Sequence, residues 1–244
     1  MKLGSTGNII IGSIRYDQTV RALATIGFKT HEKGVYQSGL SFQRFMDGRQ
    51  HILVNQATDA IGNYRGLIYY DREVERLKNN LHSLGVTTTY SNISLDGMIS
   101  EFQTENGVRV FLSDADAPPS PSPTGSSQVE FGNFGEFAIH VKDLNASIQF
   151  WEKMGMRCTY SNEEWQFAIL TDDILVIGVH SHDLKYQPAI SYFHPDNPAV
   201  VGKLKAKGVE FVSWVEYETN NKPAVDAVTQ LPDGSFLFLL TGNV

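Results

Sequence analysis

The sequence predicts an α+β protein built as a tandem repeat, in which each half pairs two βαβββ units into a curved mixed sheet backed by helices. Two pairs of similar segments indicate the repeat: residues 81–86 (LHSLGV) recur as 204–209 (LKAKGV), and residues 107–112 (GVRVFL) recur as 234–239 (GSFLFL). The offsets are 123 and 127 residues. Segments that recur in the same order at nearly one period indicate a duplicated domain. A ligand site is therefore expected in or between two related halves.

A proline-rich segment separates the halves. Residues 115–130 contain four prolines interleaved with small polar residues. Proline has no amide hydrogen for a sheet ladder, so this segment is expected to be a semi-extended linker. We therefore predict a first module over residues 1–114 and a second over residues 131–244.

In the first half, apolar alternation and turn residues predict the elements in order. Asp17 begins a helix that Gly27 ends, because aspartate is favoured at helix starts and glycine at helix ends. Asp47-Gly48 marks the turn of a hairpin. The predicted elements are a strand at 9–16, a helix at 17–26, a hairpin of 40–45 with 51–55, a strand at 66–70, a helix at 73–84, and paired strands at 98–105 and 108–113.

The second half repeats this order. Asp143, 126 residues after Asp17, can cap a helix that carries an apolar stripe and ends at Gly155. Pro232-Asp233-Gly234 is typical of a tight hairpin turn. The predicted elements are a strand at 137–142, a helix from 144, a hairpin of 165–170 with 174–179, a strand at 189–193, a helix at 198–207, a strand at 209–215, and a hairpin of 224–231 with 235–240.

Composition limits the classes of partner. The chain has 244 residues, 41% of them hydrophobic, and a net charge of −7 without a basic cluster, so nucleic acid and membrane surfaces are not expected partners. Its longest apolar runs are far shorter than the roughly 18 residues of a membrane helix, and no leader pattern precedes them. We therefore expect a cytoplasmic protein. Cys158 is the single cysteine, interpreted as a structural thiol.

Two motifs resemble the vicinal oxygen chelate superfamily, which includes glyoxalase I, extradiol dioxygenases and bleomycin-resistance proteins. Residues 136–151 (EFAIHVKDLNASIQFW) resemble the opening strand and helix of such a module, and residues 231–238 (LPDGSFLF) resemble its closing hairpin. The resemblance covers nearly the whole chain and is stronger in the second half. It implies a glyoxalase/bleomycin-resistance-like fold, a scaffold that carries many unrelated activities.

The resemblance also implies where metal ligands would lie, and most of these positions cannot bind a metal. In the second half they are Glu136, Ala189 and Phe238. In the first half they fall near Ile10, Gly66 and Phe111. A catalytic divalent site needs about three protein ligands, and one glutamate does not supply them. We therefore expect no cofactor, with a divalent metal at Glu136 as the alternative.

Strand alternation and the family pattern select the candidate site residues on the concave faces. The catalytic candidates are Glu136 and His140, whose α-carbons are roughly 13 Å apart on an extended strand. Each could act separately as an acid or a base; otherwise Glu136 is a remnant that is solvated or paired with a cation. His180 and His182 are interpreted as part of a solvated loop. The ligand-binding candidates are Arg109, Phe111, Trp165, Phe167, Ser191, Phe193, Phe236 and Phe238.

These residues describe an apolar, aromatic pocket with few polar groups, which suits a small, partly apolar ligand. The leading hypothesis is a small-molecule binder of the bleomycin-resistance type, acting as a monomer or homodimer. The competing hypothesis is a metal-dependent lyase, isomerase or dioxygenase that uses Glu136. The sequence has no phosphate-binding glycine loop, no Gly-x-Ser-x-Gly and no His-Glu-x-x-His, which argues against nucleotide hydrolysis, serine hydrolysis and zinc proteolysis.

Overall fold

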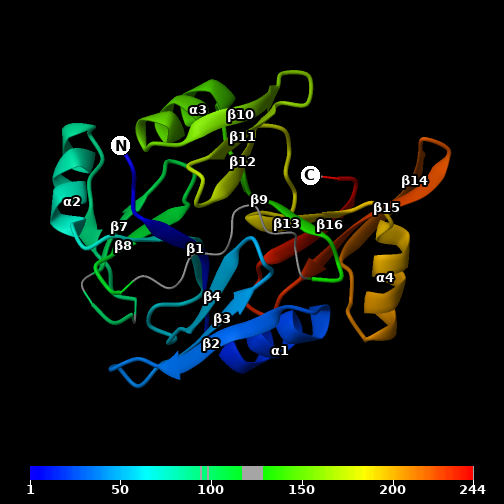
Figure 1. The fold of residues 1–244 in the computed structure, drawn as a ribbon, viewed down its shortest axis with the longest axis horizontal. Helices are drawn as coiled ribbons and strands as arrows, with labels where there is room; N and C mark the ends of the chain where they lie inside the picture. Colours follow the sequence, from blue (N-terminus) through cyan, green and yellow to red (C-terminus); the bar gives the residue numbers. More distant parts are fainter. Residues whose placement is uncertain (94, 98, 117–128, 244) are drawn as a thin grey trace.

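The computed structural model describes residues 1–93, 95–97, 99–116 and 129–243, and over these residues it has two eight-stranded sheets and four helices (Figure 1). The helices are α1 (Tyr16–Ile26), α2 (Val74–Ser83), α3 (Leu144–Lys153) and α4 (Asn197–Ala206). The strands of the first sheet are β1 (Thr6–Ser13), β2 (Lys29–Val35), β3 (Ser41–Met46), β4 (His51–Gln56), β5 (Tyr64–Tyr70), β6 (Thr89–Tyr90), β7 (Ile99–Gln103) and β8 (Arg109–Ser113). Those of the second are β9 (Asn133–His140), β10 (Arg157–Asn162), β11 (Phe167–Thr171), β12 (Val176–His180), β13 (Ala189–His194), β14 (Ser213–Thr219), β15 (Lys222–Gln230) and β16 (Phe236–Thr241).

The two sheets have the same topology, which confirms the tandem repeat of paired βαβββ units. The first sheet has the order β2-β3-β4-β1-β5-β8-β7-β6, and the second has β10-β11-β12-β9-β13-β16-β15-β14. In each sheet the two opening strands are antiparallel to each other, and each is parallel to the closing strand of its own unit. Most of the predicted linker lies outside the described residues, and Val129, near its end, is buried.

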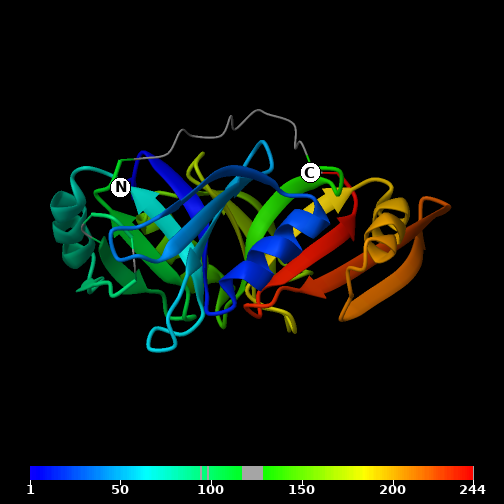
Figure 2. The ribbon, with the colours of Figure 1, turned by 90° about the horizontal axis from the view of Figure 1, so that it is seen from below.

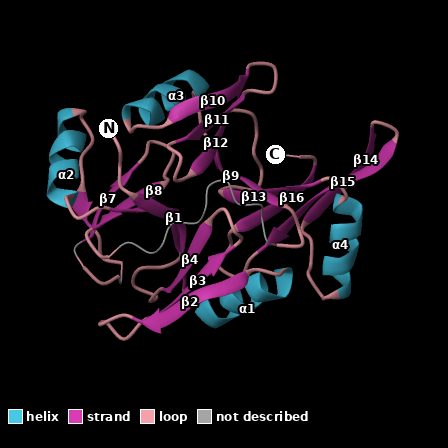
Figure 3. Ribbon diagram, in the orientation of Figure 1, coloured by secondary structure: helices cyan, strands magenta, loops and turns pink. Residues whose placement is uncertain are grey.

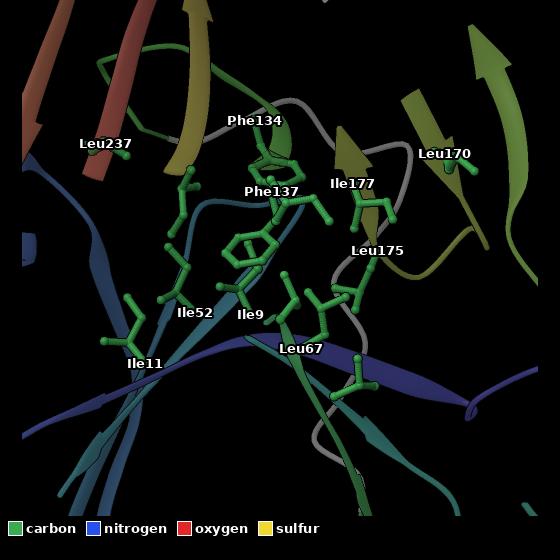
Figure 4. Close-up of a cluster of buried hydrophobic side chains, with 14 of the residues drawn as sticks. Ile9, Ile11, Ile52, Leu67, Phe134, Phe137, Leu170, Leu175, Ile177 and Leu237 are labelled. Carbon is green, nitrogen blue, oxygen red and sulfur yellow. The ribbon is translucent and has the colours of Figure 1, made fainter. Parts of the chain in front are cut away.

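The modules contact each other through a shared hydrophobic core. In Figure 4, side chains from β1, β4 and β5 of the first sheet face side chains from β9, β12 and β16 of the second. These residues are at most 3% exposed: Ile9, Ile11, Ile52, Leu67, Phe134, Phe137, Ile177 and Leu237. Burying each such side chain stabilises the fold by about 1.5–3 kcal/mol. Each sheet has a second face that points away from this shared core, and we call it the inner face of that sheet. The two inner faces are the surfaces on which a ligand could bind.

Two reciprocal aspartate–tyrosine contacts show the repeat at atomic level. Tyr192 of the second module donates a hydrogen bond to Asp47 of the first, 2.6 Å away, and Tyr69 of the first lies near Asp172 of the second. Each aspartate also accepts hydrogen bonds from the backbone amides two and three residues after it. Burial, with the neighbouring carboxylate, raises the pKa of both tyrosines well above the usual value, and burial raises the pKa of Asp47.

The peripheral elements differ most from the sequence predictions. Helices lie around the strands, with α2 and α4 at opposite ends of the long axis (Figures 2 and 3). The edge strands β2 and β10 were not predicted, because their mostly exposed residues do not alternate in burial. Edge strand β14 begins four residues after the predicted strand. None of the described helices is long and apolar enough to cross a membrane.

Helix starts give one confirmation and one correction. Asp143 caps α3, accepting a hydrogen bond of 2.9 Å from the amide of Ala146. Asp17 does not cap α1: it lies in the first turn, and Arg15 occupies the N-cap position without a side-chain bond. The start of α1 is instead fixed by Ser13, whose hydroxyl accepts from the amide of Arg15 at 3.0 Å.

Candidate functional site

Three strands at the centre of the second sheet bring a carboxylate, a hydroxyl and a phenyl ring into one row on the inner face. Glu136 of β9 is opposite Ser191 of β13, and Ser191 is opposite Phe238 of β16. Ala189, the expected middle position, is instead opposite Ala138, one step along the same face. The Ser191 hydroxyl donates to the backbone carbonyl of Glu136 at 3.3 Å, which ties the two strands together at the row.

The carboxylate of Glu136 makes a buried contact with His180. Its Oε1 is 2.8 Å from His180 Nε2, and the two residues are 7% and 9% exposed. The prediction of a solvated loop was wrong for His180, because β12 extends to this residue and directs its ring to the inner face. Gly178 makes the contact possible, since a β-carbon there would overlap the Glu136 carboxylate. In the sequence, the pair could have been found from Gly178, which lies two residues before His180 on β12, the strand next to Glu136.

The imidazole of His180 lies between aromatic rings. It stacks on Phe167 with a centroid distance of 5.4 Å and an interplanar angle of 9°, and the ring of His182 meets it edge-on at 5.2 Å. His180 Nδ1 is buried and has no hydrogen-bond partner among the described residues. A neutral imidazole that donates its Nε2–H to Glu136 has an acceptor at Nδ1, whereas a protonated imidazole donates from both nitrogens.

Most of the predicted binding residues of the second module share this inner face. Strand alternation and register place Phe167, Phe193, Phe236 and Phe238 there, and each is partly exposed. His140 is also partly exposed, and the register places it beside His180. Apolar rings accessible to solvent around one buried polar pair form a surface on which a flat, partly apolar molecule can stack.

Three predicted site residues do not join this group. Arg109 and Phe111 belong to the first sheet, so they do not lie on the inner face of the second. Arg109 pairs with Glu101 at 2.6 Å, and Phe111 is fully buried in a hydrophobic cluster of its own module. Trp165 precedes β11 in a turn and is 67% exposed, because β11 begins two residues later than predicted.

The inner face of the first module is mostly filled by its own side chains. Its hydrophobic cluster includes Ile10, Leu53, Ala57, Tyr64, Ile68, Tyr70, Ile93, Ile99 and Phe111. The row that corresponds to Glu136, Ser191 and Phe238 consists of Asn8, Ile68 and Phe111. Where the first sheet has Ile10 beside Leu53, the second has Ala138 beside Gly178. At this pair of positions the second inner face has the smaller residues, and it also holds the Glu136–His180 pair, so it is the candidate site.

The donor groups of the site do not match a three-ligand metal centre. Glu136 and His180 could each bind a divalent ion, but Phe238 has no donor atom and the Ser191 hydroxyl is a weak ligand. Among the described residues, no group of three or more histidine, cysteine, aspartate or glutamate side chains could hold a metal ion.

Comparison with solved structures identifies the fold. No protein-family model matches the chain, and no curated protein does. A catechol 2,3-dioxygenase structure matches with a TM-score of 0.61 and 15% identity, over 100% of this chain and 89% of that chain. The halotolerant catechol dioxygenase BphC matches with a TM-score of 0.58 and 15% identity, over 100% and 88%. The Mn(II)-bound glyoxalase from Novosphingobium aromaticivorans matches with a TM-score of 0.62 and 13% identity, over 96% and 80%. The chain therefore has the vicinal oxygen chelate fold.

Proposed function

We propose that this protein binds a small, partly apolar molecule on the inner face of the second module, without the three-ligand metal centre of its fold. The observation that carries the proposal is the buried Glu136–His180 pair, at 2.8 Å, among partly exposed phenylalanine rings. Phe238 stands in the row beside Glu136 and Ser191, where it offers a ring for stacking in place of a metal ligand. This is binding of the bleomycin-resistance type.

The side chains define what the ligand needs. Phe167 already stacks on His180, so a flat ligand extends an existing aromatic layer. A neutral His180 that donates its Nε2–H to Glu136 has an acceptor at Nδ1 without a partner among the described residues, and a ligand with a hydroxyl or N–H group would supply the donor. Glu136 holds the imidazole in place. A planar aromatic molecule with one hydrogen-bond donor meets these requirements.

The second candidate is a metal-dependent lyase, isomerase or dioxygenase that uses Glu136. It is favoured by the fold, which is shared with catechol dioxygenases and an Mn(II)-bound glyoxalase, and by the two potential donors of the Glu136–His180 pair. It is opposed by Phe238 in the third position of the row. We therefore rank it below metal-free binding.

A thermal-shift screen against planar phenols and amines tests the proposal, because a ligand that binds only the folded state raises its stability. We expect at least one planar hydrogen-bond donor to raise the melting temperature of the wild type. His180→Phe and Phe238→Ala should abolish that shift, whereas Trp165→Ala, at the exposed turn, should keep it. No shift with any compound, or an equal shift in all variants, would contradict binding at this face.

A further inference from the structure

A cavity at one end of the first module's inner face is separate from the site described above. Its volume is about 350 Å³, within the range of small-molecule sites. It is lined by Glu32, Tyr36, Phe42, Arg44, Tyr70, Leu95, Asp96, Gly97, Ser113, Ala115 and Asp116. The cavity lies at the edge of this module's hydrophobic cluster, with which it shares Tyr70.

The cavity contains a buried guanidinium group. Arg44 of β3 is 7% exposed, and its Nη1 pairs with Glu32. The hydroxyl of Tyr70 is close enough to Arg44 for the guanidinium to lower the pKa of Tyr70, although burial raises that pKa overall. Arg44 Nε is buried without a hydrogen-bond partner among the described residues. A buried donor without an acceptor is unfavourable, more so when it is charged, so this atom indicates a missing acceptor.

The present counter-ion of Arg44 can be exchanged for another carboxylate. Glu32 lies on edge strand β2, and its side chain is 48% exposed. A released Glu32 would be solvated, so only the buried Arg44 guanidinium needs a replacement partner, and a ligand carboxylate supplies one. The Glu32 carboxylate therefore occupies a place on the guanidinium that a ligand carboxylate can take.

The remaining walls select the rest of the ligand. Tyr36 and Phe42 stack at 4.6 Å and 25°, and together with Leu95 they offer an apolar aromatic wall. Two exposed carboxylates, Asp96 and Asp116, also line the cavity. Asp116 pairs with Arg72 at 2.8 Å, and Asp96 accepts from the Gln37 amide at 3.0 Å. A second negative charge on the ligand would be repelled by these two groups.

We infer that this cavity is a second ligand site that takes an aromatic monocarboxylate. The carboxylate replaces Glu32 on Arg44 and supplies the acceptor that Nε lacks, and the ring packs against Tyr36 and Phe42. This inference is independent of the function proposed for the second module.

Isothermal titration calorimetry with benzoate tests this inference on the full chain. We expect saturable binding in the wild type, at least threefold tighter binding in Glu32→Gln because the competing carboxylate is removed, and at least tenfold weaker binding in Arg44→Gln. Benzamide and terephthalate should bind at least tenfold more weakly than benzoate, the first for lack of charge and the second for its extra charge. Glu136→Gln should leave the benzoate affinity unchanged, which separates this site from the second module.

Glu32→Gln changes a half-exposed side chain and keeps the test valid if Arg44→Gln does not fold. The inference is overturned if benzoate fails to bind Glu32→Gln, if Glu32→Gln binds no more tightly than the wild type, if folded Arg44→Gln keeps the wild-type affinity, or if Glu136→Gln removes binding.

Discussion

Gly178→Ala should break the Glu136–His180 contact, because the new β-carbon would occupy the space of the Glu136 carboxylate. Both partners are less than 10% exposed, so their separation leaves a buried carboxylate and a buried imidazole without their hydrogen bond. Breaking a buried pair costs about 3–5 kcal/mol when one partner stays buried, and alanine in a strand regains about 0.5–1 kcal/mol relative to glycine. We therefore expect the free energy of unfolding to fall by about 2–4 kcal/mol.

A double-mutant cycle in urea isolates this effect. In a Glu136→Ala background the carboxylate is absent, so the added methyl group should cost less than about 1 kcal/mol. Gly202→Ala on α4 is a matched control: a β-carbon there contacts nothing within 4 Å, and the variant should be stabilised by about 0.5–1 kcal/mol. If Gly178→Ala lowers stability equally in both backgrounds, or not at all, the glycine does not accommodate the Glu136 carboxylate.

Three further predictions concern stability. Burial raises the pKa of five tyrosines in the folded protein: Tyr36, Tyr64, Tyr69, Tyr70 and Tyr192. Above pH 10 these tyrosines therefore ionise in the unfolded chain before they ionise in the folded one. For each of them the free energy of unfolding should fall by up to about 1.4 kcal/mol per pH unit. Urea unfolding that is unchanged between pH 9 and pH 11 would contradict this. Burial, with nearby His31 and Arg44, lowers the pKa of His51 to about 4, so stability present above pH 6.5 should be lost as the pH falls towards 4, and His51→Gln should flatten this part of the profile. Asp143→Ala should lower the free energy of unfolding by about 1 kcal/mol through loss of the α3 cap, and an unchanged urea midpoint would refute the cap's contribution.

The fold could be predicted because its main signals are local. Gly85 and Gly208 end corresponding helices with positive φ, and Gly107 and Gly234 turn corresponding hairpins, so the repeat is visible in the sequence. Edge strands such as β2 are mostly exposed on both faces and lack the alternation that marks a half-buried strand. Such strands form because a neighbour offers free backbone groups, which is a property of the assembled sheet.

The sequence predicted which site residues of one strand share a face, but not which residues of different strands contact each other. Alternation placed Glu136 and His140 on one face, and it placed Ser191 with Phe193. The partner of Glu136 lies 44 residues away, and its identity depends on the register between β9 and β12. Arg109 was predicted together with these residues but lies on the other sheet, because the faces through which the two halves pack cannot be read from either half alone.

The metal content of protein purified without chelator tests the central claim most directly. Measured by mass spectrometry, wild type and Glu136→Ala should both carry less than about a tenth of an equivalent of Fe, Mn, Ni or Zn, because the row of Glu136, Ser191 and Phe238 does not provide three ligands. One equivalent of metal in the wild type that is lost in Glu136→Ala would contradict metal-free binding and establish the metal-dependent alternative.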